Sequence, residues 1–302
     1  MKNLDINKLS IEFKDKLKIN YDIKKKNWFN IGGKAKLFFK AENLEELRSF
    51  IKEIDNQKKI FVLGAGSNTL FTDGVYNGVV IKLSKNFNNI SKLSEEIIIA
   101  GSAVTDRALA DFAMENNLSG FEFLSCIPGT IGGGIKMNAG CFGSEFKDIL
   151  LSVQAINKKG QIITIQSKDI KFEYRNSNLP DDLIYLSASF RGKVSDKNII
   201  KSLVKEYKDQ KKVSQPLRIK TSGSTFKNPI QQTKTKVWEL IKKSVPLDTR
   251  FGDAIISNKH CNFFENKGNA KFLDMKKLII FVSEKVFEKT GIKIEPEIKI
   301  IE

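Results

Sequence analysis

Glycines gather in two segments of this 302-residue chain, and their spacing is typical of a site for a large ligand. In the longer segment, Gly129, Gly132, Gly133 and Gly134 follow Pro128 closely. Glycine lets main-chain N–H groups point into a ligand and permits positive φ without steric cost. The ligand expected here is flat, phosphate-bearing, or both. The alternative is that these glycines only mark tight turns and bulges.

The shorter segment reads Gly64-Ala65-Gly66-Ser67-Asn68 and directly follows an apolar strand that begins at Ile60. A strand that ends in a glycine turn with Ser and Asn presents N–H and hydroxyl donors, which is how a backbone holds a diphosphate. It is not the dinucleotide fingerprint, because no third glycine opens a helix and the chain turns back into a strand. Taken alone, this segment fits a simple turn equally well.

Four polar residues have side chains suited to proton transfer or to holding an anion. Ser224 lies in a Ser-Gly-Ser-Thr turn that presents its hydroxyl openly, or that simply bonds its own backbone. Arg175 follows two aromatic residues and could equally be a surface arginine packed along its stem. Glu295 and Glu297 lie two apart in an expected strand, so both leave one face if Pro296 keeps the pleat. A solvated strand edge is the alternative for this pair.

The elements that must position these residues follow from the spacing of apolar side chains. Asn43 with Glu46 is typical of a capping box, and Thr105 of a helix N-cap. Residues 1–26 read as an amphipathic basic lead-in that ends in Lys24-Lys25-Lys26 and is expected to form a solvated surface. Helical spacing predicts helices, and alternation predicts strands. The helices are expected over 44–55, 105–116, 196–212, 234–244 and 272–289, and the strands over 35–39, 151–157, 161–166, 182–190, 254–257 and 292–301.

Composition bounds the possible functions. With 41% hydrophobic residues, the chain can bury a real core and make two domains or a domain with a lobe. The formal charge of +16 could serve nucleic acid, a membrane surface or anionic small molecules. The sequence has no arginine-rich arm, RNA-binding aromatic signature or helix-turn-helix pattern. A solvated basic surface is therefore the default expectation.

The three cysteines, Cys126, Cys141 and Cys261, fit neither a zinc site nor an even-numbered disulfide framework. The N-terminal segment is charged, and no apolar run approaches the length of a membrane span. We therefore expect a reducing cytoplasm and no membrane association. His260 is the only histidine, which disfavours mechanisms that need a pair of them.

Seven blocks of sequence, in order and spacing, resemble the UDP-N-acetylenolpyruvoylglucosamine reductase family, flavoproteins of peptidoglycan synthesis. The resemblance runs from about Asn27 onward. Residues 190–215 leave little room for the additional loop of longer members, so the chain resembles the shorter form. The blocks are NWFNIGGKA, LGAGSNTLFTDGVYNGVVIKL, GFEFLSCIPGTIGGGIKMNAGCFGSEFKD, FEYRNS, SGSTFKNP, AIISNKHCNFFENKGNA and IEPEIKII.

The resemblance implies an α+β fold with an FAD-binding module of the vanillyl-alcohol-oxidase type in two subdomains, followed by a C-terminal α+β substrate domain. The expected domains are subdomain 1 over 1–85, to which a last strand at 292–302 returns, subdomain 2 over 86–195, a connector over 196–215 and the substrate domain over 216–291. The implied FAD contacts are Gly64, Ala65, Gly66, Ser67, Asn68, Ser125, Pro128, Gly129, Thr130, Gly133 and Asn138.

The implied reaction has two hydride steps. NADPH reduces FAD, and the flavin then reduces the enolpyruvyl group of UDP-N-acetylglucosamine enolpyruvate to give UDP-N-acetylmuramate. By match to the motifs, Ser224 protonates C2, while Arg175 and Glu297 polarise the substrate carboxylate and stabilise the intermediate. The further substrate contacts implied are Tyr174, Gln215, Lys227 and Asn228. The expected partners are the UDP-sugar and NADPH, with no nucleic acid or membrane, and the protein is expected to be a monomer.

Two other functions are compatible with parts of the sequence. The first is a hydroxy-acid or sugar oxidase on the same flavin module, with FAD attached through Cys126 or Cys141. The second is a basic nucleic-acid-binding protein without catalysis, which would show no flavin absorbance and a steep salt dependence of binding.

Overall fold

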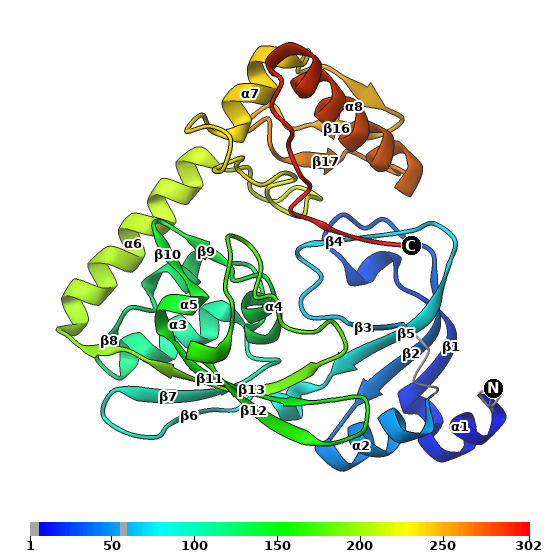
Figure 1. Ribbon diagram of the computed structural model, residues 1–302, viewed down its shortest axis with the longest axis vertical. Coiled ribbons are helices and arrows are strands. Elements are labelled where there is room, and N and C mark those ends of the chain that lie inside the picture. The colour runs from blue at the N-terminus through cyan, green and yellow to red at the C-terminus, as the bar shows by residue number, and fades with distance from the viewer. Residues whose placement is uncertain (1–5, 55–58) are drawn as a thin grey trace. The chain divides into compact units, whose positions relative to one another are not determined.

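The computed structural model describes residues 6–54 and 59–302 of the chain (Figure 1). These residues form two compact units. The first contains 6–19, 37–54, 59–65 and 77–211, and the second contains 20–36, 66–76 and 212–302. Among the described residues, no helix has the length and apolar character needed to cross a membrane.

One hydrophobic core of the first unit packs on a sheet of four strands in the order β1-β2-β5-β3. The rings of Phe39 and Phe50 stack with centroids 3.9 Å apart, and Phe13 meets both edge-on. Leu9 and Phe13 are buried, so the prediction of a solvated lead-in was wrong. The apolar residues of its short helix do not share one face, since Ile11 is exposed, so the pattern does not stand out among the charges. The elements are α1 (Ile6–Phe13), β1 (Leu17–Asp22), β2 (Lys34–Ala41), α2 (Leu44–Glu53), β3 (Ile60–Val62) and β5 (Val75–Leu83).

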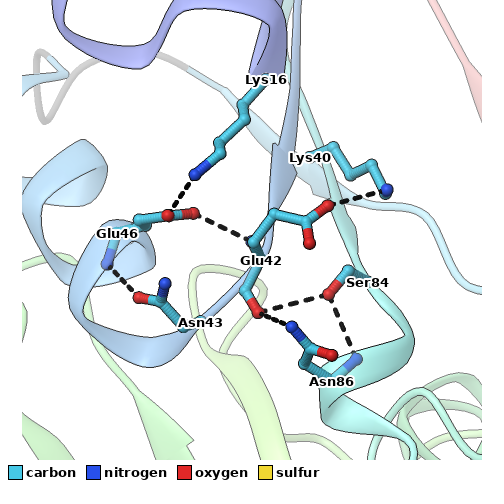
Figure 2. A network of polar contacts seen from close by, with 7 residues as sticks. All are labelled: Lys16, Lys40, Glu42, Asn43, Glu46, Ser84 and Asn86. Carbon is cyan, nitrogen blue, oxygen red and sulfur yellow. Dashed lines mark hydrogen bonds and ion pairs between the residues drawn. The ribbon is translucent and has the colours of Figure 1, made fainter.

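Polar contacts fix the start of α2 against this sheet (Figure 2). The Asn43 side chain accepts from the Glu46 N–H at 2.9 Å, a cap that contributes about 1 kcal/mol. The predicted capping box is only half formed, because the Glu46 carboxylate accepts from the Glu42 N–H instead and pairs with Lys16. The Asn86 side chain donates to the Glu42 carbonyl at 2.9 Å, which ties the same turn to the segment after β5.

A second core of the first unit lies under an antiparallel sheet of five strands in the order β12-β11-β13-β7-β6. Helices α3, α4 and α5 lie on one face of it (Figure 1). Thr105 caps α3 as predicted, accepting from the Ala108 N–H at 3.2 Å. The larger elements are β6 (Ile90–Lys92), β7 (Ile97–Gly101), α3 (Asp106–Glu115), α4 (Ile131–Lys136), α5 (Phe146–Ile149), β11 (Leu150–Ile156), β12 (Ile162–Gln166) and β13 (Ile184–Arg191). The two-residue strands are β8 (Leu118–Ser119), β9 (Gly140–Cys141), β10 (Ser144–Glu145) and β14 (Lys193–Val194).

The second unit has its own core between two helices and a three-stranded sheet in the order β15-β16-β17. The same unit also contains a parallel pair of strands, β4 with β18, which lie far apart in the sequence. The predicted strand over 292–301 was too long, because Pro296 cannot donate to a ladder and only the end of that segment is a strand. The elements are β4 (Thr69–Phe71), α7 (Val237–Ser244), β15 (Arg250–Phe251), β16 (Ala254–Ile256), β17 (Phe264–Asn266), α8 (Phe272–Thr290) and β18 (Lys299–Ile301).

Helix α6 (Lys197–Ser214) is the predicted connector helix, and it lies in the first unit as far as Lys211. The predicted mixture of helices and strands is confirmed, with hairpins and helices close to their expected bounds. The domain boundaries at 85, 195 and 215 stay a prediction, since they state which segments hold FAD and which hold substrate.

Candidate active site

The longer glycine segment rests on the chain that joins β7 to α3. Three backbone hydrogen bonds of 2.9 to 3.2 Å link residues 102–106 with residues 129–132. They form a short antiparallel framework, with Thr105 opposite Thr130. The bonds run from the Ile131 N–H to the Val104 carbonyl, from the Gly132 N–H to the Ser102 carbonyl and from the Asp106 N–H to the Gly129 carbonyl.

Most of the glycines in this segment are required by neighbouring protein atoms. A Cβ at Gly129 would lie 2.4 Å from Asp106 Oδ2, and one at Gly134 would lie 2.3 Å from the Phe146 ring. Gly133 is different, because its Cβ would meet only the Thr130 hydroxyl at 3.7 Å. The sequence pattern could not distinguish these roles. Gly133 is the exposed member of the set, with room beside it for a ligand.

The difference between Gly133 and Gly134 predicts opposite effects on folding. Gly134→Ala should lower the free energy of unfolding by about 1–3 kcal/mol, because the ring of Phe146 is enclosed and cannot move away. Gly133→Ala, at a helical position with space, should leave stability unchanged or raise it by up to about 1 kcal/mol. Urea unfolding of both variants measures this. A Gly134→Ala protein as stable as Gly133→Ala would contradict the packing argument.

Gly64 of the shorter segment lies close to Thr130 of the longer one in the first unit, where a Cβ at Gly64 would lie 2.6 Å from the Thr130 hydroxyl oxygen. Within ranges 6–54 and 59–302, several main-chain N–H groups of the two segments donate to no acceptor. Unpaired donors on glycine-rich turns suit phosphate or flavin oxygens, so the residues present fit FAD. The N–H groups are those of Gly64, Ala65, Gly66, Ser67 and Asn68 in the first segment, and of Gly129, Thr130 and Gly133 in the second.

Arg175 is held in a strained turn beside the second glycine segment. Its backbone has φ of 59°, a region that non-glycine residues rarely adopt outside functional or tightly packed sites. Its guanidinium donates from Nη2 to the Gly140 carbonyl at 2.7 Å and lies 3.6 Å from Glu145 Oε1. The Tyr174 ring lies under the guanidinium at 4.8 Å. The Arg175 side chain is only 15% exposed, so it is not the surface arginine that was the alternative.

Asn138 organises the same turn from inside the protein. It is fully buried, and its Nδ2 donates to Glu145 Oε2 at 3.0 Å and to the Glu173 carbonyl at 3.1 Å. Its Oδ1 accepts from the Lys147 N–H at 3.0 Å. This side chain therefore joins the glycine segment to the loop of Arg175, while its contact with FAD stays a prediction. The sequence did not single out Glu145, although it forms a capping box with Asp148 at the start of α5; its ion pair with Arg175, 30 residues further along the chain, is brought together only by the fold.

Ser224 lies in a segment that is held from both sides within the second unit. On one side the Glu297 N–H donates to the Thr225 carbonyl at 2.8 Å, and on the other the Thr225 N–H donates to the Asn262 carbonyl at 2.7 Å. Asn262 also bonds both backbone groups of Phe226 with its side chain, at 3.0 and 2.9 Å. These contacts bring Ser224 and Glu297 into one small framework. Asn262 was missed by sequence reasoning, because its partners lie in a segment that only the fold brings near.

The two candidate glutamates differ in their surroundings. The Glu295 side chain is 77% exposed and lies 3.7 Å from Lys227 Nζ. Glu297 is half-buried, and its carbonyl accepts from the Asn68 side chain at 3.1 Å. The side chain of Asn68, a residue predicted to bind FAD, is therefore attached to the Glu297 backbone.

The remaining predicted residues lie at the edges of these frameworks. Gln215 follows the last residue of α6 and is half-buried. The Asn228 side chain accepts from the Val237 N–H at 2.9 Å, so it caps the start of α7. Ser125 and Pro128 precede the exposed turn at Gly129, with Ser125 half-buried and Pro128 exposed.

Comparison with known proteins supplies the family. Residues 35–166 match a family model described as FAD binding domain, and residues 215–301 match one described as UDP-N-acetylenolpyruvoylglucosamine reductase, C-terminal domain. A UDP-N-acetylenolpyruvoylglucosamine reductase of Pelagibacter ubique (strain HTCC1062) is 59% identical over 297 residues, 98% of each chain. That of Rickettsia typhi (strain ATCC VR-144 / Wilmington) is 43% identical over 95% of this chain and 96% of its own.

A solved structure agrees with this result. The UDP-N-acetylenolpyruvylglucosamine reductase of Thermus caldophilus superposes with a TM-score of 0.80 at 29% identity, covering 95% of this chain and 98% of its own. The predicted α+β fold, with an FAD-binding module of the vanillyl-alcohol-oxidase type before a separate C-terminal domain, is confirmed. The chain therefore belongs to the UDP-N-acetylenolpyruvoylglucosamine reductase family of FAD-dependent oxidoreductases.

Proposed function

We propose that this protein uses NADPH to reduce the enolpyruvyl group of UDP-N-acetylglucosamine enolpyruvate, forming UDP-N-acetylmuramate for peptidoglycan synthesis. Family membership supplies the flavin and the class of substrate. The observation that carries the assignment of residues is the framework around Thr225, which keeps Ser224 and Glu297 side by side in the second unit.

FAD, when bound, supplies the hydride chemistry, and the protein supplies binding, orientation and the proton. We assign the diphosphate to the N–H groups of 64–68 and the rest of the cofactor to 125–138. Ser224 Oγ holds the proton for C2. A serine hydroxyl is a weak acid, so it suits only a strongly basic carbanion as acceptor.

Arg175 and Glu297 act on the charge that develops at the substrate. The guanidinium of Arg175 is planar and carries several donors, which suits a carboxylate. Glu297 lies on the same framework as Ser224, and we assign it a role in stabilising the intermediate. Tyr174, Gln215, Lys227 and Asn228 complete the proposed substrate contacts.

Anaerobic stopped-flow absorbance of the flavin tests the proposal. Mixing with NADPH should bleach the flavin band, and adding the enolpyruvyl UDP-sugar should restore it with formation of UDP-N-acetylmuramate. NADH in place of NADPH tests the preference for the phosphate-bearing donor. A flavin that recolours with oxygen but ignores the sugar would contradict the proposal and favour the oxidase.

The thiols of Cys126 and Cys141 argue against the alternative of an oxidase with covalently attached FAD. Covalent attachment of FAD needs a reactive thiolate. Burial raises the pKa of Cys141 to about 12, and its Sγ donates to the Phe123 carbonyl at 3.2 Å. Cys126 is buried as well. The absence of nucleic-acid binding, the monomeric state and the cytoplasmic location stay predictions.

A further inference from the structure

Asp106 is a buried carboxyl group that the proposed reaction does not use. It is the first residue of α3, and its exposed fraction is 0%. Neither Oδ1 nor Oδ2 has a hydrogen-bond partner among the residues that the structure describes. A polar group buried in this way destabilises the protein unless something else is gained from it. The groups that the Asp106 carboxyl contacts therefore indicate why an aspartate occupies this position.

The carboxyl packs directly under the turn at Gly129. The Asp106 N–H donates to the Gly129 carbonyl at 3.2 Å, and Asp106 Oδ2 occupies the space next to the Gly129 Cα, 2.4 Å from where a Cβ would lie. The next residue of the turn, Thr130, lies opposite Thr105. A shift of the carboxyl would therefore shift the N–H groups of Gly129 and Thr130.

The surroundings of Asp106 favour the uncharged acid. Burial raises its pKa well above the ordinary range of aspartate. The N-terminal end of α3 favours negative charge, but this effect is smaller than the cost of removing an unpaired charge from water. On its own helix, Arg107 and Asp111 pair with each other at the surface. The titratable side chains on the elements around it, none of which bonds to it in the described part of the chain, are Glu122, Cys126, Cys141, Tyr207 and Lys211.

We propose that Asp106 is a positioning residue for FAD, and that its uncharged carboxylic acid supports the turn which presents the Gly129 and Thr130 N–H groups to the cofactor. The inference rests on the assignment of residues 125–138 to FAD in the proposed function. An ionised Asp106 would place a charge without a hydrogen-bond partner among the described residues in a fully buried position, which favours movement of the side chain and with it the turn. FAD affinity is then coupled to the protonation of a residue that does not contact FAD.

Release of FAD from the holoenzyme tests this role. The rise in flavin fluorescence on dilution gives the dissociation constant of the wild type, Asp106→Asn and Asp106→Ala between pH 6 and pH 9. The amide of Asp106→Asn has the same shape as the carboxylic acid and carries no charge. This variant should bind FAD within about threefold of the wild-type affinity. The alanine variant leaves a cavity under Gly129 and should weaken binding by about tenfold or more. Asp111→Asn, on the exposed face of the same helix, is the matched control and should behave as the wild type.

Three results would overturn the inference. Asp106→Asn could weaken FAD as much as Asp106→Ala, which would mean that the carboxylate is the working form. Asp106→Ala could bind FAD as tightly as the wild type does, which would show that the turn at Gly129 needs no support from the Asp106 side chain. The wild type could bind FAD more tightly as pH rises while Asp106→Asn stays constant, which again requires the carboxylate. A wild type that binds no flavin would instead refute the proposed function.

Stability against pH gives an independent readout. The folded protein keeps a proton on Asp106 that the unfolded chain releases at its ordinary pKa, so the unfolding free energy falls as pH rises towards the raised pKa. The folding equilibrium constant loses up to about tenfold per pH unit from this residue. Urea unfolding between pH 5 and pH 8 should show that Asp106→Asn removes this loss and Asp111→Asn retains it. Equal pH slopes for the wild type and Asp106→Asn would show an ionised carboxyl and overturn the inference.

Discussion

Replacing Ser224 by alanine should slow formation of UDP-N-acetylmuramate by about 10²–10⁴-fold while NADPH still reduces the flavin at nearly the wild-type rate. The substitution removes one hydroxyl and leaves the backbone of its segment held by Thr225 and Asn262. The proton for C2 then has no positioned donor, but nothing that contacts the flavin in the reductive half-reaction has changed. The two half-reactions can be separated in one anaerobic stopped-flow experiment.

A serine far from the site provides the control. Ser283 lies on α8, where its hydroxyl donates to the Ile280 carbonyl at 2.8 Å, and Ser283→Ala should leave both half-reactions intact. A Ser224→Ala enzyme that loses flavin reduction and product formation equally would refute the proton-donor role, because the loss would then reflect damage to flavin binding.

Replacing Glu297 by glutamine should slow the step that consumes the sugar by about 10²–10³-fold, the usual loss when one group that stabilises developing charge is removed. Glutamine keeps the shape, so the backbone bonds from Glu297 to Thr225 and from Asn68 to Glu297 should survive. Flavin reduction by NADPH should be nearly unchanged. Single-turnover reoxidation of the reduced flavin by the UDP-sugar measures this effect.

Glu295→Gln is the matched control, because it changes the same residue type two positions away. Its side chain is largely exposed, and its ion pair with Lys227 is worth little at a solvated surface. The rate of the sugar step should stay within about twofold of the wild type. If Glu295→Gln were the more damaging substitution, the assignment of the two glutamates would be reversed.

Local patterns in the sequence predicted helices and strands well where apolar residues recur at a regular spacing along one face of the element. Helices α3, α7 and α8 begin and end within a few residues of their expected bounds, because apolar spacing and caps act within one segment. Helix α1 in the N-terminal lead-in was not predicted, because it is short and only Leu9 and Phe13 of its residues are buried. The region around Pro296 failed because the alternation continues through a proline, which has no N–H to donate and forms only an isolated bridge, with Phe226.

Candidate site residues could be predicted only where the residue type itself indicates a chemical role. Glycine turns and an exposed serine are visible in the sequence, so the candidate residues could be named. Asn262, Glu145 and Asp106 were not, since their importance lies in partners that are distant along the chain. For the same reason, the sequence could not show that Gly129 and Gly134 leave no room for a Cβ beside Asp106 and Phe146, whereas Gly133 has room for one.

The parallel pairing of β18 with β4 has a consequence for biosynthesis. Asn68 and Glu297, which bond to each other next to this pair, are 229 residues apart in the chain. At ~5–20 residues per second, a ribosome needs roughly 10–50 s to make the intervening chain. Throughout that interval the nascent glycine loop at 64–68 lacks its closing strand, and the unpaired edge of β4 is open to wrong partners. Faster folding of the earlier cores would not shorten this wait, so the loop at 64–68 gains its closing contacts only after residues 297–301 have been made.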